Sequence, residues 1–86
     1  MRQQYTTLAD NLLNAYHIKV MNLKAATGIA AEVRATSTAD HAFRLSVGLE
    51  GLQTVAKAAC DYEAYEEIER LISKVSCGNF PIAGSW

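Results

Sequence analysis

The side chains here that could bind a transition metal are two histidines and two cysteines: His17, His41, Cys60 and Cys77. By type they would suit zinc, which takes nitrogen and sulfur ligands in proteins. Their separations along the chain are 24, 19 and 17 residues, whereas the ligands of a structural zinc come in closely spaced pairs. We therefore expect no metal site and no cofactor.

A nucleophilic active site would need a Ser or Cys, a base within hydrogen-bonding reach and an acid that orients the base. Asp40 beside His41 is the one suggestive neighbourhood, but consecutive residues of a helix point about 100° apart. The chain has no Gly-x-Ser-x-Gly turn, and the segment 48–51 lacks the lysine of a phosphate-binding loop. We expect a protein that is not an enzyme.

The elements that would position these side chains are predicted by apolar residues at alternating steps of three and four, the spacing of one helix face. Helices are expected over roughly 6–27, 38–59 and 61–76, with an irregular apolar tail over 78–86. The stripe of the second helix is Ala42, Leu45, Leu49, Leu52, Ala56 and Ala59. The expected fold is all-α, a three-helix bundle or a helical hairpin plus a third helix, in one domain over residues 1–86.

Polar residues and glycines predict where these helices begin and end. The first helix would begin near Thr6 or Thr7, with Asp10 three positions after Thr7, and would either end at Gly28 or continue to about Ala35. The segment 36–38 (Thr-Ser-Thr) is expected to be a turn before the second helix. A third helix between Cys60 and Cys77 would hold their thiols about 24 Å apart, so we expect reduced cysteines.

A different fold is compatible with part of the sequence. Apolar and polar residues alternate over 43–50, which is the period of a strand, and Gly48 and Gly51 weaken a helix by about 1 kcal/mol each. The alternative is an α+β fold with a small three-stranded antiparallel meander. The helical stripe covers more residues than the alternation, and its flanks are rich in Ala, so we favour the helix.

The composition bears on partners and location. The net charge is −1, with five basic and three acidic residues over 1–46 and three basic and six acidic over 47–86. The basic residues form no cluster of the kind that binds DNA or RNA, so we do not expect nucleic acid as a partner. No signal peptide and no apolar run of about 20 residues is present, so we expect a cytoplasmic protein without a membrane span.

Three surfaces are candidates for binding a partner. The first is an acidic face made of Asp61, Glu63, Glu66, Glu67 and Glu69. The second is the apolar tail with Phe80, Ile82 and Trp86, which would either fold over the core or form an arm onto another chain. The third is a helix-packing seam made of Leu45, Gly48, Leu49, Gly51 and Leu52, used within the monomer or across a dimer.

These patterns favour a small non-enzymatic protein-interaction module. It would act as a regulator, inhibitor or assembly subunit by covering the surface of another protein, one with a basic surface if the acidic face binds it. We also expect self-association as a homodimer. The alternatives are a helical nucleic-acid-binding protein, which would use Arg2, Lys19, Lys24, Arg34 and Arg44, and a small ligand-binding bundle.

Overall fold

The computed structural model describes residues 3–86, and every regular element in this range is an α-helix. The helices are α1 (Gln3–Ala25), α2 (Ala31–Ala58) and α3 (Tyr62–Ser76). The all-α prediction is confirmed. The strand interpretation of residues 43–50 is wrong, because α2 continues without a break through Gly48 and Gly51 and buries its leucine stripe.

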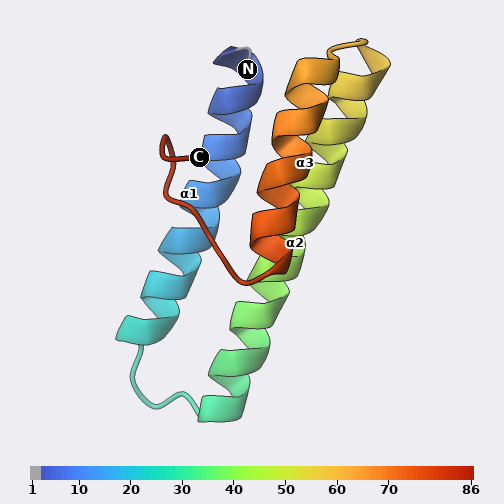
Figure 1. Cartoon of the computed structure of the whole chain (residues 1–86). Coiled ribbons are helices and arrows are strands. Elements are labelled where there is room, and N and C mark those ends of the chain that lie inside the picture. Colours follow the sequence, from blue (N-terminus) through green and yellow to red (C-terminus); the bar gives the residue numbers. More distant parts are fainter. Residues whose placement is uncertain (1–2) are drawn as a thin grey trace.

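The three helices form an elongated bundle of 48 × 18 × 17 Å. The central helix is α2, which packs against both α1 and α3 and runs antiparallel to each of them (Figure 1). After α3 the tail turns away and crosses to α1. The C-terminal tail therefore lies beside α1, the first helix of the chain.

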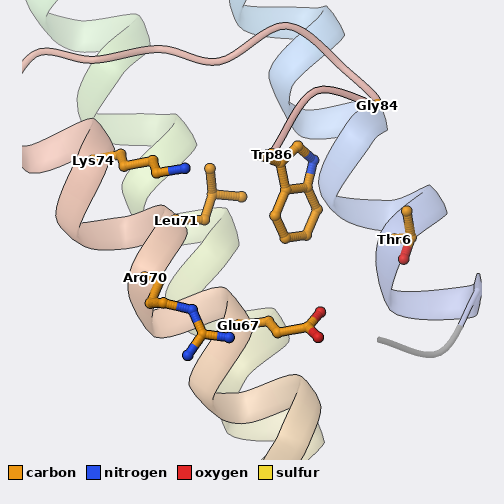
Figure 2. A pocket seen from close by; sticks show the side chains of 7 residues that line it. All are labelled: Thr6, Glu67, Arg70, Leu71, Lys74, Gly84 and Trp86. Carbon is orange, nitrogen blue, oxygen red and sulfur yellow. The ribbon is translucent and has the colours of Figure 1, made fainter.

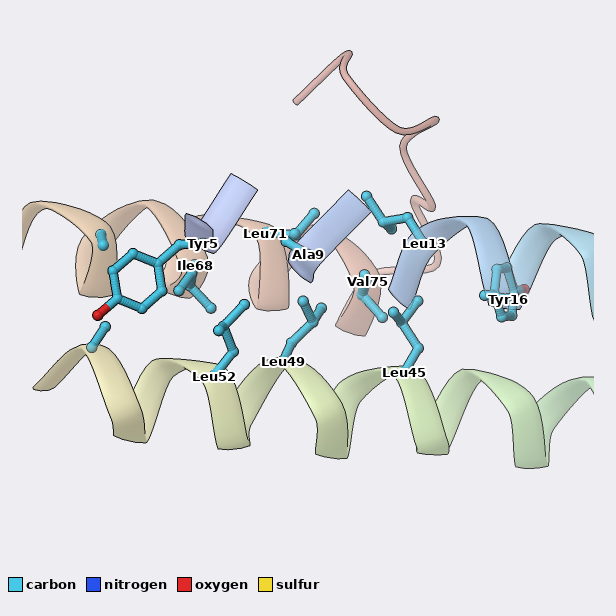
Figure 3. Close-up of a cluster of buried hydrophobic side chains, with 12 residues drawn as sticks. Tyr5, Ala9, Leu13, Tyr16, Leu45, Leu49, Leu52, Ile68, Leu71 and Val75 are labelled. Atoms are coloured by element: carbon cyan, nitrogen blue, oxygen red, sulfur yellow. The ribbon is translucent and has the colours of Figure 1, made fainter. Parts of the chain in front are cut away.

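The core lies where all three helices are present, and its side chains point into the space between them (Figure 3). Its members are Tyr5, Ala9, Leu13, Tyr16, Leu45, Leu49, Leu52, Ala56, Ala64, Ile68, Leu71 and Val75. The predicted stripe of α2 supplies four of them, whereas Ala42 is half-buried and Ala59 is exposed. The spacing of three and four thus predicted the buried face of α2 correctly.

The half of the bundle that contains the α1–α2 connection has no third layer. No residue between His17 and Arg44 is buried, because α3 ends before it reaches this region (Figure 1). Ile18, Met21 and Phe43 are more than half exposed there. This end of the molecule is a hairpin of α1 and α2, and the tail reaches only its border, where His17 bonds to Pro81.

The beginning of α2 differs from the prediction. The helix begins at Ala31 rather than near residue 38, and the predicted turn at 36–38 is helical. The hydroxyl groups of Thr36 and Thr38 donate to the carbonyl oxygens of Glu32 and Arg34, each at 2.9 Å, so they bond within the helix instead of capping it. Each of these threonine hydroxyls thus has a hydrogen-bond partner within the helix, and the helix is not interrupted.

The connection between α1 and α2 is therefore short. Gly28 has φ of 76°, which only glycine adopts without strain, and reverses the chain direction just after α1. Arg34 of α2 donates from Nη2 to the carbonyl oxygen of Ala26 at 3.1 Å. Of the two alternatives left open by the sequence, a first helix that ends before Gly28 is the correct one.

The C-terminal ends of α2 and α3 have the same geometry. In α2 the N–H groups of Cys60 and Asp61 donate to the carbonyl oxygens of Lys57 and Ala56 at 3.0 and 2.9 Å. In α3 those of Gly78 and Asn79 donate to Val75 and Lys74 at 3.0 and 2.8 Å. Both are Schellman motifs, which require a left-handed residue. Gly78 occupies that position in α3, and Cys60 occupies it in α2 with φ of 58°.

Candidate interaction surfaces

The apolar tail lies on its own chain. The ring of Phe80 stacks on the ring of Tyr16 with centroids 4.3 Å apart, and Nε2 of His17 donates to the carbonyl oxygen of Pro81 at 3.0 Å. Trp86 is half-buried, whereas Ile82 is 69% exposed. Phe80 and Trp86 thus follow the first alternative for the tail, folding over the core, and Ile82 remains on the surface.

Trp86 forms one wall of an open pocket of about 450 Å³ between α1 and α3. Figure 2 shows its indole ring in the space between Leu71 of α3 and the first turns of α1. Glu67, Arg70 and Lys74 supply the polar side chains from α3. This pocket carries charges of both signs and is built partly from the tail itself.

The acidic residues near the beginning of α3 do not form a single face. Asp61 is the N-cap, and its side chain accepts the N–H of Ala64 at 3.3 Å. Glu69 accepts a hydrogen bond from Gln53 of α2, and Glu67 lines the Trp86 pocket on the opposite flank of α3. Glu63 and Glu66 are the two exposed acids that remain between these flanks. The five predicted acidic residues therefore lie in four different environments.

The two glycines of the predicted seam differ in their surroundings. A Cβ atom added at Gly48 would lie 2.8 Å from Cδ2 of Leu12, so this glycine permits close approach of α1 to α2. A Cβ atom added at Gly51 would meet nothing within 4 Å. Gly48 therefore serves packing within the monomer, whereas Gly51 leaves a gap that the chain does not fill. The leucines of the seam, Leu45, Leu49 and Leu52, are all buried.

That gap belongs to an apolar groove between α1 and α2. This part of the groove encloses about 360 Å³ and is lined by Leu8, Asn11, Leu12, Gly48, Gly51, Leu52 and Val55. Leu8 and Val55, on opposite walls, are 50% and 58% exposed. Large apolar side chains thus border a floor that is made partly of glycine.

A second hollow of about 220 Å³ continues the groove toward the α1–α2 connection, with Leu12 common to both. It is lined by Leu12, Ala15, Tyr16, Lys19, His41, Arg44 and Leu45. The two hollows together form what we call the α1/α2 groove. Lys19 and Arg44 lie at its basic end, and Leu8 and Val55 lie at its apolar end.

The glycines of this groove were predicted from the sequence, but the residues of α1 that form its other wall were not. Leu8, Leu12, Ala15 and Lys19 recur at steps of four, three and four beside the core stripe of α1, a second helical face that could have been recognised. The stripe with Ala9, Leu13 and Tyr16 is the one that belongs to the buried core between the three helices.

The basic residues considered for nucleic acid are dispersed. Lys19 and Arg44 line the groove, whereas the guanidinium of Arg34 donates to a backbone carbonyl at the α1–α2 connection. Lys24 lies near the end of α1, outside the groove lining. Arg2 is outside the described residues. Residues 3–86 thus bring two of these five cations together.

Side chains that bind metal ions are not gathered in the described part of the chain. Within residues 3–86 no three His, Cys, Asp or Glu side chains lie together as metal ligands would. Cys60 and Cys77 are free and exposed. Burial raises the pKa of Tyr16 above its ordinary value of 10.0, so its hydroxyl stays protonated at neutral pH. Over the same residues, no helix combines the length and apolar character needed to cross a bilayer.

Comparisons of this chain with protein families, with curated proteins and with solved structures find no match. We therefore infer the function of this chain from its three-helix fold and its α1/α2 groove.

Proposed function

We propose that this chain is a small non-enzymatic protein-interaction module that binds a helix of a partner protein in the α1/α2 groove. The observation that supports this proposal is the unfilled space over Gly51 between the exposed side chains of Leu8 and Val55. Glycine inside a helix costs about 1 kcal/mol relative to Ala, and at Gly51 no contact within the chain compensates for it. A helix packed against this floor would supply that contact.

The dimensions of the groove favour a helix over an extended peptide. Its lining residues on α2 run from His41 to Val55, which at 1.5 Å per residue is about 21 Å, or roughly four turns. Both walls are helices, so they offer no free backbone N–H and C=O groups for a strand to pair with. An amphipathic helix would instead place apolar side chains at every third or fourth position into the groove.

In this role the module would act as a regulator, inhibitor or assembly subunit, because a partner helix held in the groove is covered and withdrawn from other contacts. We place it in the cytoplasm, where exposed free thiols such as Cys60 and Cys77 stay reduced. The sequence also led us to expect a homodimer and a partner with a basic surface. These two interactions are alternatives to the binding of a partner helix in the groove. The first would fill the groove with a second copy, and the second would use Glu63 and Glu66.

A display library of amphipathic helical peptides of about 16 residues, random at the apolar positions, tests groove binding. The whole chain is the bait, in its native form and as the variants Val55→Lys and Phe43→Lys. Both replaced residues are exposed and apolar on α2, at 58% and 68%, but only Val55 lines the groove. We expect helices to be enriched by the native chain and by Phe43→Lys, and to be lost with Val55→Lys.

Equal loss with both variants, or enrichment that survives Val55→Lys, would contradict binding in the groove. Glu66→Lys separates the acidic surface from the groove, because Glu66 is exposed and lies outside the lining of either hollow. Groove binding predicts that this variant selects the same helices as the native chain. Sedimentation of the native chain and of Val55→Lys shows whether a second copy occupies the groove.

A further inference from the structure

We infer that the partner helix carries carboxylate side chains at the end that lies over Lys19 and Arg44. This inference rests on the proposed function and adds the chemistry and orientation of the partner. It follows from the distribution of charge along the α1/α2 groove, which is apolar at one end, basic at the other and free of acidic lining residues.

The apolar end offers little for a charged partner residue to bind. Its lining has one polar side chain, the amide of Asn11, among leucines, glycines and a valine. Burying a charge against such a surface is costly. The partner helix should therefore be apolar on the face that lies between Leu8 and Val55.

The basic end has cationic groups that remain available. Among residues 3–86 no acidic group pairs with Lys19, which is exposed. Arg44 donates from Nε to Oδ2 of Asp40 at 2.9 Å, and its side chain is 75% exposed. The two terminal nitrogens of its guanidinium are left to bind a second carboxylate. A partner carboxylate would find two cations here, 25 positions apart in the sequence and on facing helices.

Charge also argues against a second copy of this chain as the occupant. A two-fold axis parallel to the helices would place Lys19 and Arg44 of both copies together, which is repulsive. A two-fold axis perpendicular to the helices would place the basic end of each copy on the apolar end of the other. Neither arrangement supplies the missing negative charge, whereas an acidic helix from a different protein does.

The experiment uses the same library with Glu or Lys allowed at random at both ends of the peptide. The baits are the native chain, Lys19→Glu and Lys24→Glu. Lys19 and Lys24 are both exposed lysines on α1, and only Lys19 lines the groove. We expect the native chain and Lys24→Glu to select Glu at one end of the peptide only, and Lys19→Glu to select Lys at that end.

For a single selected acidic peptide, fluorescence anisotropy should show a Kd about fivefold weaker with Lys19→Glu and nearly unchanged with Lys24→Glu, the size expected for reversing one surface ion pair. Helices selected with no preference of charge, or with Lys, would overturn the inference while groove binding stands. Selection of no helix by any bait would overturn the proposed function itself. A dimer of the native chain that dissociates in Val55→Lys would overturn the inference in favour of a second copy.

Discussion

The indole N–H of Trp86 donates a hydrogen bond of 2.7 Å to Oδ1 of Asp10. The same oxygen accepts the backbone N–H of Gly84 at 3.0 Å, so one carboxylate of α1 holds two groups of the tail. Together with the stacking of Phe80 on Tyr16, this contact folds the tail over the joint between α1 and α3. The tail therefore covers part of the three-helix core as an additional short segment.

Asp10→Ala should release the end of the tail. Loss of two hydrogen bonds to a half-buried carboxylate should lower the free energy of unfolding by about 1–2 kcal/mol. Trp86 is the one tryptophan of the chain, so its fluorescence emission should shift to longer wavelength as the indole becomes hydrated. Asp40→Ala is the control, since it removes only the exposed pair with Arg44 and should cost less than about 0.5 kcal/mol. An unchanged emission spectrum in Asp10→Ala would show that packing alone holds Trp86.

The two glycines of α2 should respond differently to the same substitution. Gly51→Ala should raise the free energy of unfolding by about 1 kcal/mol, because the new methyl group meets nothing and Ala favours the helix. Gly48→Ala gains the same propensity, but the methyl group would force Leu12 to move from a distance of 2.8 Å. Urea unfolding of the two variants should therefore give a clearly smaller gain for Gly48→Ala, and equal gains would mean that Leu12 moves freely.

The Schellman motifs at the ends of α2 and α3 allow a reciprocal test. Cys60→Gly should stabilise the chain by about 0.5–1 kcal/mol, because Cys60 occupies a left-handed conformation that glycine adopts without strain. Gly78→Ala, at the matching position of α3, should destabilise it by about 1 kcal/mol for the same reason. Thermal unfolding of both variants measures this, and a loss of stability in Cys60→Gly would mean that the cysteine side chain makes a contact of its own.

The burial of Tyr16 predicts a dependence on alkaline pH. Since the pKa of Tyr16 is raised in the folded state, the unfolded chain releases this proton first as pH rises past about 10. The contribution of Tyr16 to the free energy of unfolding should therefore be constant below pH 10 and should fall above it. Tyr16→Phe should flatten this alkaline decrease, whereas Tyr62→Phe, which alters a side chain that is 60% exposed, should leave it unchanged. A decrease of the same size in Tyr16→Phe would assign it to other groups.

The helical fold could be predicted because the apolar spacing of α2 and α3 extends over several turns. Leu45, Leu49 and Leu52 are buried as their positions in the predicted stripe indicated. The beginning of α2 could not be predicted from Thr36 and Thr38, because a threonine hydroxyl can either cap a helix or bond to the carbonyl four residues earlier. Which of the two occurs depends on whether the residues before it are helical, and here they are.

The amino-acid sequence by itself determined that the elements are helices, the buried stripe of α2 and the charge that the surface carries, because these depend on residue type and on the period of the backbone. Only the tertiary structure decided that Gly48 receives Leu12 and that Gly51 stays open, since this depends on how closely α1 approaches α2. It likewise decided that Asp10 meets Trp86, and that Lys19 and Arg44 share one end of a groove. These side chains are distant in sequence, and only the packing of α1, α2 and the tail brings them together.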